Sequence, residues 1–564
     1  MSVPVTSDPR AKRLLIVGGV AGGASAAARA RRLSEHSEII LFERGPHVSF
    51  ANCGLPYFVG GEIAQAGSLL LQTPQSLQAR FHIDVRVRTE VVRIDRAARQ
   101  VSARDLSNGR DYAEPYDALI LSTGAAPLKP PIPGIERAGH FTVRTIPDVE
   151  HIIGWLRDGP GNCAVVVGGG YIGLEMTEQL KRRGLSVSLV EALPQVMAPL
   201  DREMAAWLQQ ELRAQGVALH LNDPVAAFEA PRDKESARAS VVVLRSGARL
   251  PADVVVLGLG VRPEVGLAKD AGLRIGERGG IRVNEFLQTS DPDIWAIGDA
   301  IEVRDAITGD WNVIPLAGPA NKQGRIAADN VFGRPSQYAG TLGTAILRLF
   351  SLTAACTGAS ERALRRSGLP FLAVHLHPTS HAGYYPGAEP IALKILFAPD
   401  TGRVLGAQAV GKDGVDKRID VLATAIKAGL SVHDLAELEL AYAPPYGSAK
   451  DPVNLAGMAA QNALNGDVRL VQWSELEHLD PERTLLLDVR TDAERQHGFI
   501  PNSIHIPLDQ LRARLGELPK DREVVVSCQS GQRSYFAARI LTQHGFAVRN
   551  LTGSYRTWST ARTG

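Results

Sequence analysis

The chain has 564 residues, of which 45% are hydrophobic and 22% charged, and its formal net charge is +2 at pH 7. This length predicts three or four domains with cores of their own, and a nearly neutral chain without a long basic run is not expected to bind nucleic acid. The 4 dispersed cysteines fit a reducing compartment, the polar N-terminus lacks a signal-peptide pattern, and the apolar stretch at 14–28 is too short to cross a bilayer. We therefore expect a cytoplasmic protein without a membrane partner.

The first elements of the chain predict a dinucleotide-binding unit. A buried parallel strand at 14–17 leads into a glycine turn, then an Ala/Arg-rich helix, and a strand at 38–42 that ends at Glu43. Gly18 and Gly23 occupy the first and last glycine positions of the fingerprint, but Val20 stands at the middle position and weakens this copy.

Two later turns support this first unit. A strand at 119–121 ends in a turn of small residues, and a strand that begins near residue 294 ends in Gly-Asp. The residues of these turns are Ser122, Thr123, Gly124, Gly298 and Asp299. Turns at the carboxyl ends of parallel strands are where such sheets bind ligands.

The second copy of the unit is complete. A strand at 164–167 precedes Gly168, Gly170 and Gly173, and a further strand at 186–190 ends at Glu191. Such glycines let the backbone approach a pyrophosphate, and the helix N-terminus offers it free N–H groups. A carboxylate after the last strand accepts hydrogen bonds from ribose hydroxyls and repels a 2′-phosphate, so NADH is favoured over NADPH. The plainer interpretation is a tight turn that binds nothing.

Two of the cysteines lie in loops whose composition indicates sulfur chemistry. Cys53 belongs to the run Ser-Phe-Ala-Asn-Cys-Gly-Leu-Pro-Tyr at 49–57, and no second cysteine lies near it in sequence, so it must pair with an external sulfur or oxygen. Cys528 opens a six-residue loop that ends at Arg533, and backbone amides with an arginine are suited to hold an anion against the sulfur. Cys163 and Cys356 border apolar strands and are interpreted as inert core cysteines.

The order of these motifs from about residue 12 to 460 resembles the flavoprotein disulfide reductase superfamily, in which an FAD-binding unit is interrupted by an NAD-binding unit. The resemblance implies that Asp299 bonds the ribityl chain of FAD. The C-terminal part resembles a single-domain rhodanese through Asp-Val-Arg at 488–490, Gly-Phe-Ile-Pro at 498–501 and the Cys528 loop.

We therefore expect an α/β chain with two Rossmann-like nucleotide-binding domains, an α+β dimerisation domain and a C-terminal rhodanese-like α/β domain. The expected bounds are 12–125 and 255–335 for a split FAD-binding domain, 126–254 for the NAD-binding domain, 340–462 for the dimerisation domain and 468–564 for the rhodanese-like domain.

The Cys53 run also resembles that of coenzyme A-disulfide reductases, whose resting cysteine carries coenzyme A as a mixed disulfide. In that family a tyrosine matching Tyr442 reaches the flavin and the thiol from the other subunit of a homodimer, and a basic residue at the Lys450 position meets coenzyme A. Tyr384 resembles a second such tyrosine, with interface packing as the alternative. The residues that the resemblance places along the coenzyme A channel are Ser25, Arg29, Arg32, Ser49, Asn52 and Asn321. For the two arginines, which lie one turn apart on the first helix, the alternative is a solvated basic face.

Together these features predict a homodimeric FAD enzyme, without a metal, that uses NADH to reduce coenzyme A disulfide, coenzyme A persulfide or polysulfide. Cys53 is expected to be the redox thiol, with its pKa lowered by the flavin and nearby donors, and Cys528 with Arg533 is expected to carry sulfane sulfur. Two alternatives stay open. One is an NADH oxidase or peroxidase that cycles Cys53 through sulfenic acid, and the other is a redox sensor that binds NADH without turnover.

Overall fold

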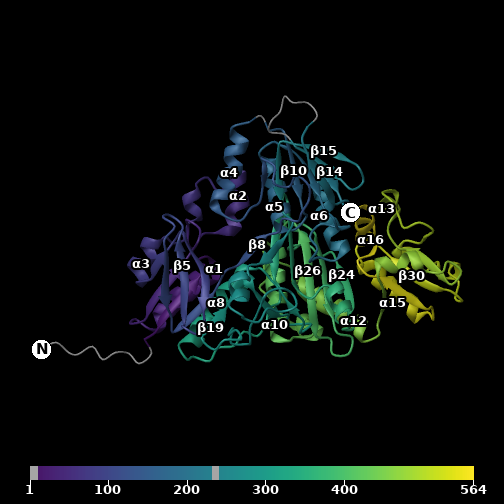
Figure 1. Cartoon of the computed structure of the whole chain (residues 1–564). Helices are drawn as coiled ribbons and strands as arrows, with labels where there is room; N and C mark the ends of the chain where they lie inside the picture. Colours follow the sequence, from purple (N-terminus) through teal and green to yellow (C-terminus); the bar gives the residue numbers. More distant parts are fainter. Residues whose placement is uncertain (1–10, 160, 232–239) are drawn as a thin grey trace. The chain divides into compact units, whose positions relative to one another are not determined.

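The structure, a computed structural model, describes residues 11–159, 161–231 and 240–564. By their contacts these residues form two compact units. The first unit takes the positions up to 192 together with 223–343, and the second takes 193–222 together with 344–564. In Figure 1 the C-terminal part of the second unit is drawn in yellow.

The first unit contains the five-stranded parallel sheet that the first glycine turn predicted. Its strands run in the order β19-β7-β1-β2-β3. They are β1 (Arg13–Val17), β2 (Glu38–Phe42), β3 (Asp84–Arg86), β7 (Ala118–Leu121) and β19 (Ile294–Ala296). Most of their residues are buried aliphatic side chains, as a parallel sheet covered on both faces requires. Helices α1 (Ala21–Leu33) and α8 (Ala317–Val331) lie side by side in this unit (Figure 1).

A second parallel sheet of this unit carries the second glycine turn. Its strands within the unit run in the order β11-β10-β16-β9, and helix α5 (Tyr171–Arg182) follows the turn. They are β9 (His140–Phe141), β10 (Cys163–Val167), β11 (Ser186–Val190) and β16 (Val254–Leu257). Both predicted strand–turn–helix–strand units are therefore present.

The remaining elements of the first unit are short helices and small sheets. Two three-stranded antiparallel sheets are β4 (Thr89–Asp95), β5 (Gln100–Asp105) and β6 (Asp111–Pro115), and β13 (Val225–Glu229), β14 (Ser240–Leu244) and β15 (Arg249–Ala252). The shorter strands are β8 (Ala125–Pro127), β17 (Val261–Pro263), β18 (Ile281–Arg282), β20 (Ile301–Arg304) and β21 (Trp311–Asn312). The other α-helices are α2 (Leu55–Gly60), α3 (Pro74–Phe81), α4 (Ile146–Arg157) and α7 (Gly266–Asp270).

An antiparallel sheet forms the centre of the second unit. Its strand order is β22-β23-β26-β25-β24, and helices α10 (Val415–Ala428) and α12 (Pro452–Leu464) pack against it. The strands are β22 (Ala345–Leu349), β23 (Leu352–Gly358), β24 (Leu372–Leu376), β25 (Ile391–Phe397) and β26 (Val404–Gly411). Further elements of this part are α6 (Arg202–Ala214), β12 (Ala218–His220), α9 (Glu361–Arg366) and α11 (Val432–Glu437).

The C-terminal module is a parallel sheet with helices on both faces. Its strands run in the order β27-β31-β30-β28-β29. They are β27 (Arg469–Val471), β28 (Thr484–Asp488), β29 (Ile504–His505), β30 (Glu523–Ser527) and β31 (Val548–Leu551). Helix α15 (Gln532–Gln543) covers the face of Val524 and Val526, while α16 (Ser554–Thr563) covers the face of Val525 (Figure 1). The smaller helices are η4 (Trp473–His478), α13 (Asp492–Gln496), α14 (Leu508–Leu511) and η5 (Leu515–Glu517).

Residues 193–222, which were expected within the NAD-binding domain, are grouped by their contacts with the second unit. The reason is visible in α6, which packs against α16 and whose buried Glu203 bonds Lys394 of β25. Helix α12 ends at Leu464, two residues beyond the expected end of the dimerisation domain at 462. Within the described residues, no helix is both long and apolar enough to cross a membrane.

Candidate active sites

The first glycine turn is required by the packing of the chain itself. Gly18 follows β1 with φ +96°, and a Cβ there would lie 2.1 Å from the carbonyl oxygen of Ser122. A Cβ on Gly23 would lie 1.8 Å from the carbonyl oxygen of Gly18. Glu43 accepts hydrogen bonds from the backbone N–H of Gly19 at 2.9 Å and of Gly45 at 2.8 Å. The predicted glycines and acid therefore form one turn at the end of β1.

The two supporting turns converge on this first turn. A Cβ on Gly22 would lie 3.1 Å from Ser122 Oγ, and Gly298 in the 3-10 turn η3 (Gly298–Ala300) is close to the same hydroxyl. Burial raises the pKa of Asp299, with the charge of Arg144 opposing that shift. Thr123 Oγ1 donates to the carbonyl oxygen of Glu264 at 2.6 Å. The backbone N–H of Glu264 donates in turn to the carbonyl of Gly124 at 2.9 Å. The ends of β1, β7 and β19 thus meet around one position.

The second glycine turn repeats the construction of the first. Gly168 has φ +109°, and a Cβ there would lie 2.2 Å from the carbonyl oxygen of Gly258. A Cβ on Gly173 would lie 1.8 Å from the carbonyl oxygen of Gly168. Gly170 differs, because a Cβ there would meet nothing within 4 Å, so its side faces open space. Glu191 Oε2 accepts from the N–H of Gly169 at 2.6 Å, as Glu43 does in the first turn.

Cys53 lies exposed in the 3-10 turn η1 (Asn52–Gly54), between β2 and α2. Its N–H donates to Asn52 Oδ1 at 3.1 Å, and its Sγ lies 3.7 Å from the same oxygen. Although the side chain reaches solvent, protein atoms on its inner side desolvate the thiol and raise the pKa of Cys53, and the carboxylates of Glu175 and Asp299 raise it further. Burial and these two carboxylates therefore oppose the lowering of this pKa that we expect from the flavin and nearby donors.

The predicted coenzyme A residues lie in part around α1. Ser25 Oγ bonds Asn321 Oδ1 of α8 at 2.5 Å, so these two are brought together, while Arg32 and Asn52 are exposed. Ser49 is held with φ +49° beside the first glycine turn, where its N–H donates to the carbonyl of Gly19. Arg29 is already paired, because Asp329 of α8 lies 2.6 Å from its guanidinium and both side chains are largely buried. Asp329 therefore offsets the charge that we expected to meet a phosphate.

The two predicted tyrosines meet in the second unit. The hydroxyls of Tyr384 and Tyr442 lie 2.9 Å apart, and this hydrogen bond raises the pKa of the exposed Tyr384. Both loops are attached to the buried Arg418, which donates to the carbonyl of Ser380 at 2.8 Å and to Asp451 at 2.8 Å. Lys450, next to Asp451, is exposed.

The Cys528 loop follows β30 and precedes α15. Cys528 is 1% exposed, and the N–H of Gly531 points at its Sγ from 3.1 Å. Arg533 forms a two-pronged pair with Glu494 of α13 at 2.5 and 2.7 Å. Hydrogen bonds to Glu494 raise the pKa of Arg533 against desolvation, and the Cys528 sulfur contributes to the same shift. The hydrogen bonds from Arg533 lower the pKa of Glu494 to about 2.

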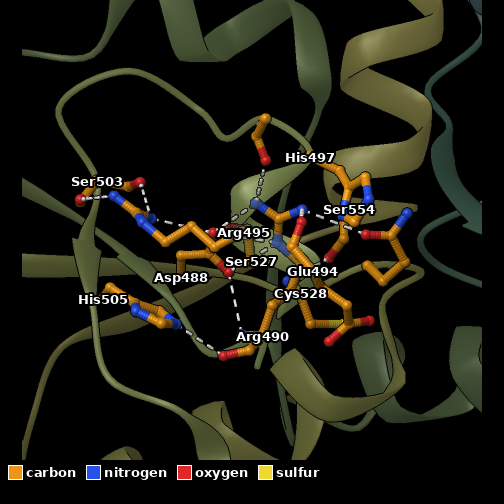
Figure 2. Close-up of polar contacts among 12 residues, drawn as sticks. Asp488, Arg490, Glu494, Arg495, His497, Ser503, His505, Ser527, Cys528 and Ser554 are labelled. Carbon is orange, nitrogen blue, oxygen red and sulfur yellow. Dashed lines mark hydrogen bonds and ion pairs between the residues drawn. The ribbon is translucent and has the colours of Figure 1, made fainter. Parts of the chain in front are cut away.

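A buried ion-pair network supports this loop from β28 (Figure 2). Arg490 is 1% exposed and donates to Asp488 Oδ2 at 2.8 Å, and its guanidinium lies 4.1 Å from the centre of the Tyr555 ring. Arg495 bonds Asp488 at 3.1 Å and Ser503 at 2.9 Å. Buried charges of this kind persist when every donor is satisfied, and Arg490 also donates to Gln529 Oε1 of the Cys528 loop at 3.3 Å, so the Asp-Val-Arg motif supports that loop.

Three family models match the chain. One is described as pyridine nucleotide-disulphide oxidoreductase and covers residues 12–324, one is the dimerisation domain of that family at 344–452, and one is a rhodanese-like domain at 474–561. The chain belongs to the pyridine nucleotide-disulphide oxidoreductase family. The predicted family and fold class are thereby confirmed.

Similar proteins cover either most or nearly all of the chain. Two curated relatives are each 34% identical over 80% of the chain: an NADH oxidase from Methanocaldococcus jannaschii, covered over 99% of its length, and a coenzyme A disulfide reductase from Staphylococcus epidermidis, covered over 100%. The solved structure of reduced Bacillus anthracis CoADR-RHD has a TM-score of 0.95 and 49% identity, with 98% of each chain covered. That of a NAD-dependent persulfide reductase from A. fulgidus has a TM-score of 0.90 and 39% identity, covering 97% of this chain and 100% of that one.

The family implies a flavin and a nicotinamide nucleotide, and the two glycine turns fit them. At Gly170 the backbone is open to a close ligand, whereas a Cβ on Gly168 or Gly173 would meet backbone oxygen atoms of the chain itself. In both turns a carboxylate stands at the end of the second strand, at Glu43 and Glu191, where ribose hydroxyls are bound in such folds. Gly298 and Asp299 stand at the end of β19, beside the first turn.

Several residues of these sites were not found from the sequence. They are Asp329 beside Arg29, Glu175 near Cys53, Arg418 behind the tyrosines, and Glu494 and Ser554 beside the Cys528 loop. Each comes from an element remote in sequence from the residue that it contacts. A fixed spacing to a known motif would have located only Glu494, which lies between the Asp-Val-Arg and Gly-Phe-Ile-Pro runs.

Proposed function

We propose that this enzyme uses NADH to reduce sulfur–sulfur bonds in coenzyme A disulfide, coenzyme A persulfide or polysulfide, with Cys53 as the redox thiol and Cys528 as a sulfur carrier. The observation that carries the proposal is the pair of thiol loops, one beside a nucleotide-binding turn and one in an amide-lined cradle, in a chain whose four cysteines form no disulfide with one another. When bound, FAD carries two electrons from NADH to a disulfide at Cys53.

The chemistry at Cys53 needs only one protein thiol. The Cys53 thiolate attacks coenzyme A disulfide, forming a Cys53–coenzyme A mixed disulfide and releasing one coenzyme A thiolate. Two electrons then cleave the mixed disulfide and regenerate the Cys53 thiolate with a second coenzyme A thiolate. The net change consumes one NADH and one proton for two coenzyme A thiols. With coenzyme A persulfide, the first step instead releases hydrosulfide.

The protein supports these steps at named positions. The thiolate is the attacking form, and burial together with the carboxylates of Glu175 and Asp299 disfavours it, so electrostatic assistance must come from the bound nucleotide or a donor such as a tyrosine hydroxyl. We assign Tyr384 and Tyr442 as hydroxyl donors that act in a homodimer. Lys450 and Arg32, both exposed, are assigned to coenzyme A phosphates, with Ser25, Arg29, Ser49, Asn52 and Asn321 along the same channel.

At Cys528, the thiolate attacks the outer sulfur of a persulfide, forming Cys528 persulfide and releasing a thiol. The short loop, the amide of Gly531 and the nearby Arg533 stabilise the anionic sulfur.

We further assign the enzyme to the cytoplasm.

The nicotinamide donor is assigned from Glu191. Its carboxylate lies against the second glycine turn, bonded to the N–H of Gly169, where a 2′-phosphate would meet a negative charge. We expect kcat/KM for NADH to exceed that for NADPH at least about tenfold, since one such repulsion is worth about 1.4 kcal/mol or more. Steady-state assays with both donors test this, and equal values would refute the assignment.

A second candidate is an NADH oxidase, because one relative of equal identity carries that name. In that reaction Cys53 would cycle through sulfenic acid, and the Cys528 site would have no role. A third is a redox sensor without turnover. Steady-state NADH oxidation with coenzyme A disulfide, coenzyme A persulfide, polysulfide and oxygen as separate acceptors distinguishes them. We expect rapid turnover with at least one sulfur acceptor and slow turnover with oxygen, whereas oxygen as the best acceptor would overturn the proposal.

A further inference from the structure

Ser554 touches the sulfur-carrying residue from the far side of its loop. It is the first residue of α16, it is fully buried, and its Oγ accepts a hydrogen bond from the backbone N–H of Cys528 at 3.1 Å (Figure 2). The same hydroxyl donates to the carbonyl of Leu551 at 3.1 Å and lies 3.1 Å from Ser534 Oγ.

The next two residues of α16 bind the loop as well. The N–H of Tyr555 donates to the carbonyl of Cys528 and the N–H of Arg556 donates to the carbonyl of Gln529, each at 3.0 Å. In a planar trans peptide the C=O of one residue and the N–H of the next point in opposite directions. Turning these two carbonyls toward α16 therefore turns the N–H groups of Gln529 and Ser530 to the opposite side, toward the concave face of the loop. With the Gly531 N–H on Sγ, three successive amides are oriented for the sulfur.

Ser554 holds this position in an unfavourable backbone conformation. Its φ is +51°, in the left-handed region where glycine is the usual residue. The preceding residue is Gly553, also left-handed at φ +68°, and a Cβ on it would lie 2.8 Å from the Cβ of His375. A side chain at position 554 is thus strained, and its hydroxyl is the group that the position gains over a glycine.

The start of α16 is itself fixed by the antiparallel sheet of the same unit. Thr552 Oγ1 accepts from the N–H of His375 on β24 at 2.7 Å, and the N–H of Thr552 donates to the carbonyl of Val471 at 3.1 Å. One turn further, Thr557 Oγ1 bonds His377 Nε2 at 2.8 Å. His375 also contacts Glu203, which belongs to the carboxylate cluster around the buried Lys394.

We propose that Ser554 is a positioning residue for sulfur transfer at Cys528, and that the His375–Thr552 contact lets the antiparallel sheet that contains β24 hold Ser554 in place. The proposal rests on the sulfur-carrier role assigned to Cys528. The hydroxyl aligns the first peptide of the loop, and α16 then presents the following amides to the persulfide. The sulfur site is accordingly built by two modules of one unit, not by the C-terminal module alone.

Two variants at position 554 separate the hydrogen bond from the backbone strain. Ser554→Ala removes the hydroxyl and keeps the strain, whereas Ser554→Gly removes both. We expect the sulfur-transfer kcat to fall about tenfold in each variant, because one hydrogen bond to the reacting residue is lost. The thermal unfolding temperature should fall in the alanine variant but stay equal or rise in the glycine variant. A purely structural role predicts instead that transfer follows stability, so that the glycine variant, the more stable of the two, transfers sulfur at a nearly normal rate.

Transfer is measured in the full-length holoenzyme with thiosulfate as donor and cyanide as acceptor. Cys528 thiolate takes the outer sulfur of thiosulfate with release of sulfite, and cyanide then removes it as thiocyanate. Alkylation of Cys528 by iodoacetamide, followed by mass spectrometry of its peptide, reports the reactivity of the thiol without substrate. We expect a several-fold slower alkylation in both variants, while NADH-driven reduction of coenzyme A disulfide stays unchanged.

The contact between Thr552 and His375 is tested by a second matched pair of variants. Thr552→Val removes the hydroxyl at nearly constant shape and should lower transfer about threefold, whereas Thr552→Ser keeps the acceptor and should restore it. Normal transfer and alkylation in Ser554→Gly, or equal transfer in the two Thr552 variants, would overturn the proposal. If the wild-type enzyme transfers no sulfur but its Cys528 alkylation still responds to Ser554→Gly, the carrier role fails and the positioning role stands.

Discussion

The two thiols of this enzyme occupy opposite surroundings. Cys53 reaches solvent in a short 3-10 turn, and the protein groups near it, desolvation first and then two carboxylates, raise its pKa. Cys528 is enclosed, with an amide on its sulfur and the Arg533–Glu494 pair beside it. The chain alone thus completes an anion cradle at Cys528 and leaves the stabilisation of the Cys53 thiolate to bound groups. This difference agrees with the roles that we propose, electron exchange with a cofactor for Cys53 and transport of a charged sulfur atom for Cys528.

Among the substitutions that test this difference between the two thiols, the one at Cys53 should have the largest effect on activity. Cys53→Ser should keep FAD bound and the fold intact but lower NADH-driven reduction of coenzyme A disulfide and persulfide more than about a hundredfold, because no other cysteine lies in its loop to replace it. The measurement is steady-state NADH oxidation with flavin absorbance as the loading control. Thiosulfate-to-cyanide transfer should stay at the wild-type level in the same preparation. Retention of more than a few per cent of the reductase activity would remove Cys53 from its assigned role.

The reciprocal variant sharpens the comparison. Cys528→Ser should abolish sulfur transfer from thiosulfate, and it should leave reduction of a freely diffusing coenzyme A disulfide nearly intact. The reason is that the reductase elements, from the first glycine turn to the tyrosine pair, all precede the C-terminal module in sequence. Cys163→Ser is the matched control, because that thiol begins a strand of the second parallel sheet and should affect neither activity. Equal loss of both activities in Cys528→Ser would indicate one obligatory relay in place of two separable sites.

A smaller effect is expected at the tyrosine pair. Tyr384→Phe and Tyr442→Phe each remove one hydroxyl of a 2.9 Å hydrogen bond. Each should lower turnover with coenzyme A disulfide about fivefold, the equivalent of about 1 kcal/mol. The double variant should be no worse than either single one, because the hydroxyls act as a pair. Tyr385→Phe is the control, since that neighbouring ring packs edge-on against His381. Additive losses in the double variant would show that the two hydroxyls act separately.

Local motifs predicted most of what is local in these sites. The two glycine turns, the two thiol loops and the exposed tyrosines follow from short runs of sequence, and the structure brings Gly18 to Ser122 and Tyr384 to Tyr442. What a side chain meets across the fold was not predictable in the same way. Arg29 looked available for a phosphate because its partner Asp329, although it lies on the neighbouring helix α8, is 300 residues away in sequence.

The pKa of Cys53 shows the same limit. Burial of the thiol raises this pKa most, and Glu175 and Asp299, which come from two other segments, raise it further; neither residue belongs to the motif that identified the cysteine. Likewise, none of the sequence motifs indicated that α6 would pack against α16. Motifs therefore located the reacting groups, whereas the partners that tune them required the tertiary structure.

The smallest effect is expected on the unfolding stability of the enzyme, through the Arg533–Glu494 pair beside Cys528. Glu494 has a pKa of about 2 in the folded protein, below the value of about 4.3 for an unperturbed glutamate. A depressed folded-state pKa contributes stability that is fully present above the unfolded value and is lost as the pH falls toward 2. Glu494→Gln should therefore destabilise the enzyme at pH 7 by about 1 kcal/mol, after allowance for the partial exposure of the Arg533 pair. The difference in stability between variant and wild type, followed as the calorimetric unfolding temperature, should shrink steadily from pH 5 to pH 3.

Glu517→Gln removes the exposed pair with Arg514 and serves as the control, for which we expect no measurable change at either pH. A Glu494→Gln difference that persists unchanged at pH 3 would mean that shape, and not the ionised pair with Arg533, holds α13 against the sulfur loop.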